Sequence, residues 1–234
     1  MKNIAIIIAG GVGKRVGADI PKQFIKIFDK PILIYTLESF EANSLIDEIE
    51  VVCIESWIDE LKRLIEFYKL KKIKHITSGG VYVQESIRNG VYNLLNYASD
   101  DDNIIIHDGI RPAIDSFVID DVIETCNKYG SAATSLPYNE QIFLKDDDIS
   151  SIKYIKRESL MRVSTPQCYK FKKIYEAYQR AFKEEIGIYG SSYTNTMWVE
   201  LGNRLYFSKG SDKNIKITTK DDIELFKAYL VSKG

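Results

Sequence analysis

Glycines and cations gather in a loop close to the N-terminus, directly after an apolar run over residues 4–8. The loop carries four glycines and three cations, which are Gly10, Gly11, Gly13, Gly17, Lys14, Arg15 and Lys22. Glycine lets a backbone lie close to a ligand and turn its N–H groups towards it. Arg15 and Lys22 would add positive charge beside those groups. This combination predicts a polyphosphate-binding loop.

Two well-known phosphate loops do not fit these residues. In a Walker A loop, Gly-Lys is followed by Ser or Thr, whereas Gly13-Lys14 is followed by Arg15. In a dinucleotide-binding fold the third glycine opens directly into a helix, but here it comes one residue late and Pro21 interrupts. A plain glycine-rich turn between a strand and a helix stays open as an alternative.

A second candidate is Asp108, which follows His107 directly after an apolar run over 104–106. Ligands bind open α/β sheets beyond the carboxyl ends of the strands, and a carboxylate there would hold Mg²⁺. A histidine beside a carboxylate also suits general-base chemistry. A structural role is the alternative that we favour for His107, as for His75.

A third candidate is Lys216, which lies between two isoleucines in Asn214-Ile215-Lys216-Ile217-Thr218. The alternation predicts a strand, with Lys216 pointing away from the isoleucine face. A lysine in a cleft is unfavourable unless an anion pairs with it, and a triphosphate would do so. The alternative is a solvated lysine on an edge strand, which is what we expect of Lys213.

Strands and helices are expected to alternate along the part of the chain that positions these residues. The apolar run over 4–8 predicts a first strand, further strands are expected over 48–54 and 73–76, and helical spacing predicts helices from Pro31 and over 57–68. This β-α-β-α-β order is typical of an α/β fold with a Rossmann-like, doubly wound, mostly parallel sheet. The glycine-rich loop would lie at the carboxyl ends of its strands.

Further strands are expected over 103–106, 132–136 and 205–207, and further helices after Ser86 and over 118–126, 172–182 and 221–230. The side chains expected to face inward from the first and last of these helices are Ile87, Val91, Leu94, Leu95, Ile223, Leu225, Phe226 and Leu230. Thr165-Pro166-Gln167 would be a turn. No regular pattern covers 137–154, which is long for a loop in a compact domain.

Composition narrows the class of protein. The 234 residues predict one domain, and the formal net charge of −1 gives no overall field that would favour nucleic acid. Three cysteines without C-x-x-C spacing argue against a disulfide framework or a structural zinc, so Cys53 and Cys126 are expected in the core. The first apolar run is too short for a signal peptide or a membrane span, which predicts a cytoplasmic protein without a membrane partner.

Together the motifs resemble those of the CTP-using nucleotidyltransferases, the family of methylerythritol-phosphate and ribitol-5-phosphate cytidylyltransferases. Four motifs match in order: Ala9-Gly10-Gly11-Val12-Gly13-Lys14-Arg15 with Pro21-Lys22-Gln23, His107-Asp108-x-x-Arg111-Pro112, Thr165-Pro166-Gln167, and Asn214-Ile215-Lys216-Ile217-Thr218. The resemblance covers essentially the whole chain, which is then a single nucleotidyltransferase domain over 1–234.

The resemblance implies a role for each matched position. The residues expected to supply catalytic positive charge are Arg15, Lys22 and Lys216. Those expected to contact CTP are Ala9, Gly10, Gly11, Gly13 and Asp108, with Gly80 and Ser86 at the cytosine and ribose. Asp108 would also hold Mg²⁺. The residues expected to contact the acceptor are Arg111, Thr165, Gln141 and Arg157.

The resemblance also implies a homodimer. Residues 137–157 would form an arm that reaches the second subunit, where Arg157 meets the acceptor's phosphate. Three positions depart from the family's pattern. Val83 stands where the family has a basic residue, Glu140-Gln141 where it has Asp-Thr, and Asn195 where it has Asp.

The function implied is transfer of CMP from CTP to a polyol phosphate, with release of pyrophosphate. Because the nucleophile is an ionised phosphate, no general base is needed. The departures rank ribitol 5-phosphate or a related acceptor for a surface polysaccharide above 2-C-methyl-D-erythritol 4-phosphate for isoprenoid precursors. Two other classes stay open: a non-catalytic nucleotide sensor, and an NAD(P)-dependent oxidoreductase with Glu55 at the ribose.

Overall fold

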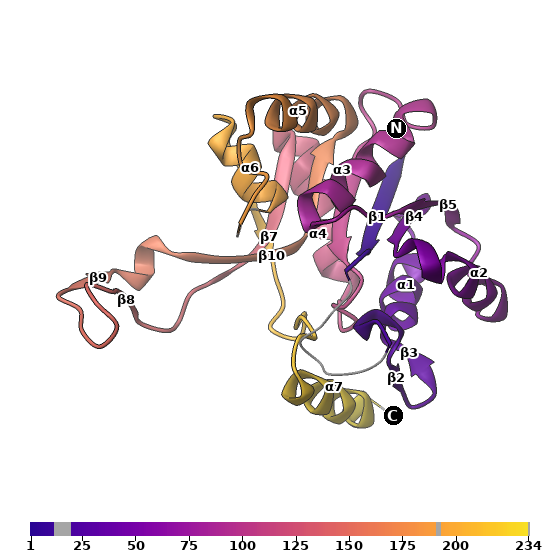
Figure 1. Cartoon of the computed structure of the whole chain (residues 1–234), viewed down its shortest axis with the longest axis horizontal. Helices are drawn as coiled ribbons and strands as arrows, with labels where there is room; N and C mark the ends of the chain where they lie inside the picture. The colour runs from indigo at the N-terminus through magenta and orange to yellow at the C-terminus, as the bar shows by residue number, and fades with distance from the viewer. Residues whose placement is uncertain (12–19, 191–192, 234) are drawn as a thin grey trace.

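A computed structural model describes residues 1–11, 20–190 and 193–233. A seven-stranded sheet runs through the molecule in the order β11-β7-β10-β6-β1-β4-β5 (Figure 1). Its strands are β1 (Asn3–Ala9), β4 (Glu48–Cys53), β5 (Ile73–Ser78), β6 (Asn103–Asp108), β7 (Ser131–Pro137), β10 (Met161–Lys170) and β11 (Phe207–Lys209). β10 is antiparallel to both of its neighbours, and every other neighbouring pair is parallel. The predicted mostly parallel α/β sheet is confirmed.

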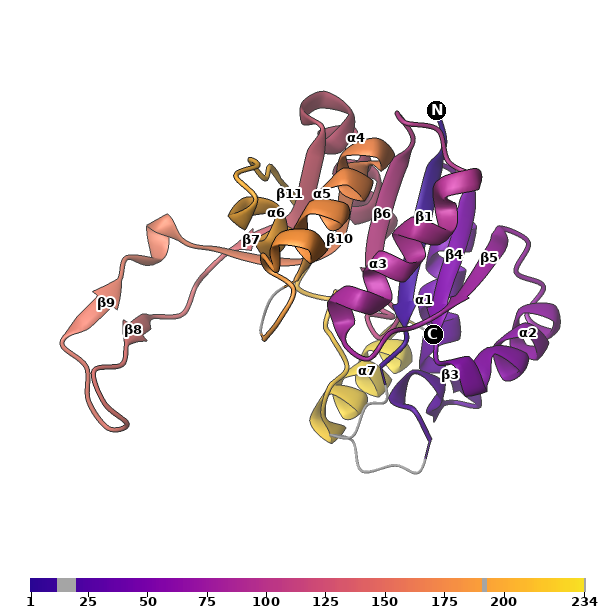
Figure 2. The same cartoon turned by 45° about the horizontal axis from the view of Figure 1, so that its top comes forward.

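Helices cover both faces of this sheet (Figure 2). One face packs against α1 (Ile32–Ala42), α2 (Ile58–Phe67) and α4 (Ser116–Tyr129), and the other against α3 (Val83–Asn93), α5 (Phe171–Glu184) and α6 (Thr194–Glu200). β1 and β6 are buried on both sides, as their apolar sequences require. All three cysteines are buried and free, as expected for Cys53 and Cys126.

A third, smaller core lies beyond the carboxyl end of β6. There α7 (Lys220–Lys233) packs Phe226 near the hairpin of β2 (Lys26–Ile27) and β3 (Lys30–Pro31), with Ile110 and Ile217 between them. This small core brings the segment after residue 213 back to the edge of the sheet where β1 and β6 end.

Residues 137–157 leave the sheet after β7 and return to it as β10. They form an arm that projects from the body and carries a two-stranded hairpin of β8 (Ile142–Leu144) and β9 (Lys153–Ile155), followed by a turn of 3₁₀ helix at Arg157–Ser159 (Figure 1). Its large apolar side chains are well exposed: Ile149 is 96% exposed and Ile152 is 85% exposed.

Several local expectations are corrected. Thr165-Pro166-Gln167 is not a turn but part of β10, because Gln167 pairs with both β6 and β7. Residues 214–218 form no strand, and the Ile217 amide instead donates to the Ile110 carbonyl at 2.9 Å. β11 begins at Phe207 rather than Leu205.

The helix boundaries also differ slightly from the predicted ones. Pro31 precedes α1 as its N-cap, and Thr194 is the first residue of α6 rather than a residue before it. Leu95 and Leu225, expected to face inward, are 50% and 57% exposed, because Leu95 falls in a 3₁₀ turn after α3 and α7 buries only Phe226 fully.

Candidate active site

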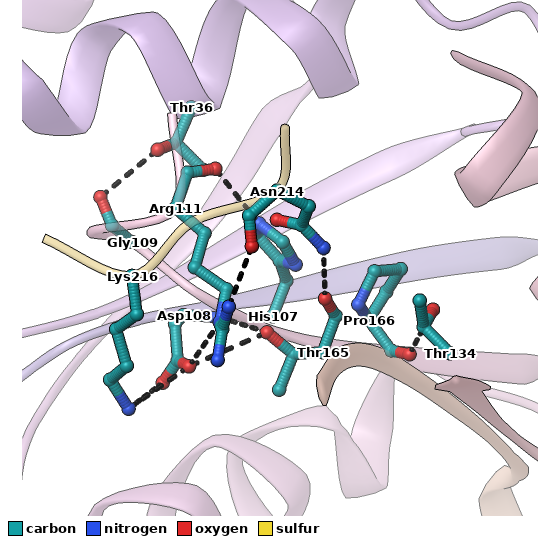
Figure 3. Close-up of polar contacts among 10 residues, drawn as sticks. All are labelled: Thr36, His107, Asp108, Gly109, Arg111, Thr134, Thr165, Pro166, Asn214 and Lys216. Atoms are coloured by element: carbon teal, nitrogen blue, oxygen red, sulfur yellow. Dashed lines mark hydrogen bonds and ion pairs between the residues drawn. The ribbon is translucent and has the colours of Figure 1, made fainter. Parts of the chain in front are cut away.

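Asp108 lies at the carboxyl end of β6, where two cations from different parts of the chain meet it (Figure 3). The Arg111 Nε donates to Asp108 Oδ2 at 2.9 Å, and the Lys216 Nζ lies 3.0 Å from the same oxygen. Burial alone raises the pKa of Asp108, but the charges of Lys216 and Arg111 outweigh it and lower that pKa to about 2. The carboxylate is therefore ionised at any physiological pH.

Asn214 ties this cluster to β10. Its backbone carbonyl accepts from the Arg111 guanidinium at 2.7 Å, and its side-chain amide donates to the Thr165 carbonyl at 2.7 Å. Both contacts are buried or half-buried, so Asn214 fixes the start of the segment that carries Lys216. In Figure 3 Asn214 lies between Arg111 and Thr165.

A break in the pairing of β10 brings Thr165 to Asp108. The register with β7 shifts between Val163 and Gln167, and the Pro166 carbonyl accepts from the Thr134 hydroxyl at 2.8 Å. The Thr165 Oγ1 then accepts from the Asp108 amide at 3.2 Å. Irregular pairing of this kind commonly redirects a side chain towards a site.

His107 is fully buried beneath the cluster. Its ring lies against Phe40, with the ring centroids 5.0 Å apart, and its Nε2 lies 3.3 Å from the Arg111 carbonyl. Burial lowers the pKa of His107 to about 3, so the imidazole is neutral at pH 7. These contacts agree with a structural role. His75 likewise pairs with Glu48, at 3.3 Å, away from this cluster.

The described part of the glycine-rich loop begins where β1 ends. Gln23 is buried and donates from its side-chain amide to the carbonyls of Ala9, at 2.6 Å, and Gly11, at 3.1 Å. With both carbonyls engaged, this end of the loop has a fixed position. Lys22 follows Pro21 and is half-buried. Gly13 and Arg15, two of the expected site residues, lie outside the described residues.

The loop after β5 packs directly against this first loop. A Cβ atom on Gly10 would lie 3.2 Å from the Gly79 Cα and from the Ser86 hydroxyl oxygen, a tight contact that would push the two loops apart by a few tenths of an ångström. Ser86 is buried in the first turn of α3 and accepts from the Gly80 amide at 3.0 Å. The structure therefore brings Gly10, Gly80 and Ser86 together. Val83, which departs from the family's pattern, is half-exposed at the start of α3.

The structure does not place every expected residue at this site. Gln141 and Arg157 line a hollow of about 590 Å³ on the arm, with Phe143 and Tyr154 beside them. Arg157 is exposed and its nearest carboxylate is its neighbour Glu158, at 3.5 Å. The expected residues thus divide into one group around Asp108 and another on the arm of the same chain.

No group of three or more His, Cys, Asp or Glu side chains in the described ranges would hold a metal by itself. Asp108 is the carboxylate at the site. Its Oδ1 takes a contact from Lys216 at 3.1 Å, and a carboxylate oxygen has two lone pairs. One carboxylate suffices for Mg²⁺ when substrate phosphates supply the remaining ligands. The residues present therefore fit a metal that arrives with a nucleotide.

A comparison with family models gives a match over residues 3–232 to the model described as "IspD: 2-C-methyl-D-erythritol 4-phosphate cytidylyltransferase". The chain belongs to the IspD family. The predicted family and enzyme class are confirmed, and the Asp108 cluster is the candidate active site of a cytidylyltransferase. Within residues 1–11, 20–190 and 193–233, no helix is long and apolar enough to cross a bilayer.

Members of the IspD family that resemble this chain differ in the acceptor that their names state. A ribitol-5-phosphate cytidylyltransferase of Lacticaseibacillus paracasei is 54% identical over 98% of each chain. A 2-C-methyl-D-erythritol 4-phosphate cytidylyltransferase of Clostridium acetobutylicum is 41% identical over 94% of each. The crystal structure of 4-diphosphocytidyl-2C-methyl-D-erythritol synthase from Anaerococcus prevotii matches with a TM-score of 0.82 and 24% identity, covering 98% of this chain and 99% of that one.

Three residues of this IspD-family site were given no role from the sequence. Gln23 and Asn214 lie inside recognised motifs, but what they contact depends on residues far away in the chain. Tyr193 carries no motif, and its ring lies over the Lys216 ammonium at 5.7 Å from the ring centroid. In the sequence, the signal that could have pointed to Gln23 and Asn214 was their closeness to cations: Gln23 follows Lys22, and Asn214 comes two residues before Lys216.

Proposed function

We propose that this chain transfers CMP from CTP to ribitol 5-phosphate, releasing pyrophosphate and forming CDP-ribitol. The observation that carries this proposal is the Asp108–Lys216–Arg111 cluster beside the glycine-rich loop. It lies in a chain 54% identical to a ribitol-5-phosphate cytidylyltransferase. The 41% relative that acts on 2-C-methyl-D-erythritol 4-phosphate makes that compound the second candidate acceptor.

In the proposed reaction, a phosphate oxygen of the acceptor attacks the α-phosphorus of CTP. A new P–O bond forms as the bond from the α-phosphorus to the β-phosphate oxygen breaks, and pyrophosphate leaves with the negative charge. No proton has to be removed from the attacking phosphate. The protein's task is therefore to position both substrates and to place positive charge at the phosphates.

Lys216 is the described cation best placed for this task. Its ammonium pairs with Asp108 at 3.0 Å, and its side chain is 29% exposed, so it can turn from the carboxylate to a phosphate without a backbone change. Arg111 stays with Asp108 and Asn214 and keeps the carboxylate ionised and oriented. Lys22 and Arg15 are proposed to act on the same phosphates from the glycine-rich loop.

Magnesium is part of the proposal. Asp108 would hold the ion together with the phosphates of CTP, and the bound ion would neutralise charge on the pyrophosphate that leaves. Gly10, Gly11, Gly80 and Ser86 would line the nucleotide, because the loops after β1 and β5 pack against each other at this edge. Thr165 would lie beside the acceptor.

A homodimer is the second part of the proposal. Gln141 and Arg157 lie on the projecting arm, while Asp108 and Thr165 lie on the body, so a site that uses all four is readily built from two chains (Figure 1). The arm's exposed apolar side chains, among them Ile149 and Ile152, would gain burial on a partner. We also propose a cytoplasmic location, where CTP is available, and a product destined for a surface polysaccharide.

The experiment that tests this function measures pyrophosphate release with CTP and Mg²⁺ in two parallel reactions. One contains ribitol 5-phosphate and the other contains 2-C-methyl-D-erythritol 4-phosphate. We expect release with ribitol 5-phosphate and a product of the mass of CDP-ribitol. Release only with the methylerythritol compound would mean that 2-C-methyl-D-erythritol 4-phosphate is the acceptor. Binding of CTP without release from either would favour a nucleotide sensor.

A further inference from the structure

Tyr193 lies beside the candidate catalytic lysine but belongs to no motif. It precedes α6, its side chain is 48% exposed, and the Lys216 Nζ lies 5.7 Å from the centre of its ring. A ring face at this distance attracts an ammonium group through its quadrupole. The Lys216 ammonium therefore has two partners, Asp108 at 3.0 Å and the Tyr193 ring.

The backbone around Tyr193 is fixed more firmly than its exposed ring suggests. Its amide donates to the Thr196 hydroxyl at 2.7 Å, and its carbonyl accepts from the Thr196 hydroxyl at 2.8 Å and from the Met197 amide at 2.9 Å. The next residue, Thr194, is buried, and its hydroxyl lies 2.8 Å from the Tyr178 hydroxyl.

Tyr178 extends this contact to the nucleotide side of the site. Its hydroxyl donates to the Gln84 side-chain carbonyl at 3.0 Å, and the Gln84 amide donates to the Gly187 carbonyl at 2.7 Å. Gln84 lies in the first turn of α3, two residues before Ser86. A buried chain of polar side chains therefore runs from α3 through α5 to the residue that follows Tyr193.

We propose that Tyr193 is a positioning residue for Lys216, held in place by the buried Gln84–Tyr178–Thr194 chain. The proposal rests on the proposed cytidylyl transfer. A lysine side chain has many rotamers, and fixing it on a phosphate costs conformational entropy. A contact that already restricts these rotamers in the free enzyme lowers the entropy lost when the phosphates bind. The ring restricts the ammonium to the space in front of Asp108, from which it reaches the phosphates.

The test compares Tyr193→Leu and Tyr193→Phe, with Tyr97→Leu as the matched control. Tyr97 is 54% exposed, and its ring lies tilted against that of His75, with the centroids 4.3 Å apart, away from the Asp108 cluster. Because an exposed cation–π contact is weak, we expect kcat to fall about three- to fivefold in Tyr193→Leu, with unchanged affinity for CTP. Tyr193→Phe keeps the ring and should keep the rate, as should Tyr97→Leu. A Tyr193→Leu enzyme with the wild-type kcat would overturn the proposal, as would a Tyr193→Phe enzyme impaired to the same degree.

The buried chain is tested by adding Tyr178→Phe to Tyr193→Leu. If Tyr178 acts through Tyr193, Tyr178→Phe lowers kcat in the wild-type background and has little further effect beside Tyr193→Leu. If the two substitutions lower kcat independently and their effects add, the role assigned to the buried Gln84–Tyr178–Thr194 side chains is contradicted. Melting temperatures of all variants show whether a loss of rate follows a loss of folded protein.

A second readout does not depend on turnover. In the free enzyme, acylation of Lys216 is followed by peptide mass spectrometry against Lys213, whose side chain is 57% exposed, as the internal reference. We expect Tyr193→Leu to raise the relative rate at Lys216 about threefold and Tyr193→Phe to leave it unchanged. An unchanged rate in Tyr193→Leu would overturn the positioning role, even if neither acceptor supported turnover and the proposed function had failed.

Discussion

Buried amide side chains hold the loops of this site in place. Gln23 donates both of its amide hydrogens to carbonyls at the start of the glycine-rich loop, and Asn214 joins Arg111 to Thr165. Neither residue carries a charge, yet each one sets where neighbouring charges lie. The two contacts of Asn214 hold Arg111 and the segment that carries Lys216 close to Asp108.

At the residue scale we predict that Gln23→Glu weakens CTP binding at least tenfold. An ionised glutamate has no hydrogen to donate, so it would face the carbonyls of Ala9 and Gly11 with repulsion and move the loop. Titration calorimetry with CTP measures the change. The control is Gln179→Glu, the same substitution at an exposed position of α5, which should bind CTP like the wild type. Equal affinity in Gln23→Glu would contradict the role given to this amide.

At the scale of elements, the carboxyl edge of the sheet assembles the site from segments far apart in sequence. β6 ends in Asp108, the break in β10 supplies Thr165, and the small core under α7 returns Lys216 to them. A separate feature of the sheet is Glu50 of β4, which is buried on the face that α3 covers. Its Oε1 accepts from Asn93 of α3 at 2.9 Å, and its Oε2 has no partner among the described residues.

This buried carboxyl should make stability depend on pH. Burial raises the pKa of Glu50 from 4.5 to about 8, so the folded chain keeps a proton that the unfolded chain loses near pH 4.5. The free energy of unfolding therefore falls as the pH rises from about 4.5 to about 8, by a few kcal/mol in this site's contribution. Glu50→Gln removes the titration and should melt at a higher temperature than the wild type at pH 8, with a smaller difference at pH 5. The exposed Glu55→Gln is the control. A difference in melting temperature between Glu50→Gln and the wild type that does not grow from pH 5 to pH 8 would contradict this account.

Much of the element order follows from the sequence, because β1 and β6 are built on continuous apolar runs and β4 ends in the apolar residues 51–53, as buried parallel strands do. The path of β10 does not follow from it. Gln167 pairs with two strands that are distant in the chain, and local pattern alone suggested a turn there. The same limit applies to the site. Motifs mark Asp108, Arg111 and Lys216, but Tyr193 is recognised only once α6 is placed beside Lys216.

At the scale of the whole molecule, the arm separates the expected acceptor residues into two groups. Gln141 and Arg157 line a hollow on the arm, and Arg111 and Thr165 lie at the edge of the sheet. In the proposed dimer, one chain's arm completes its partner's site. Every working site would then need Lys216 from one chain and Arg157 from the other.

This sharing predicts complementation between two inactive variants. Lys216→Ala and Arg157→Ala should each lose turnover as homodimers. When they are co-expressed with different tags, half of the dimers are mixed, and each mixed dimer has one site with both residues intact. We expect pyrophosphate release to recover to about a quarter of the wild-type rate. No recovery in purified mixed dimers, or a monomer by light scattering at micromolar concentration, would contradict the shared site.

The most direct test of the central claim is pyrophosphate release by Lys216→Ala compared with Lys213→Ala. The two lysines lie in the same loop, but Lys216 pairs with Asp108 at 3.0 Å, whereas Lys213 is exposed and 3.9 Å from Asp115. We predict that Lys216→Ala folds normally by circular dichroism and loses about 10²- to 10³-fold in kcat, while Lys213→Ala stays near the wild-type rate. A folded Lys216→Ala enzyme with full activity would show that the Asp108 cluster is not where CMP is transferred.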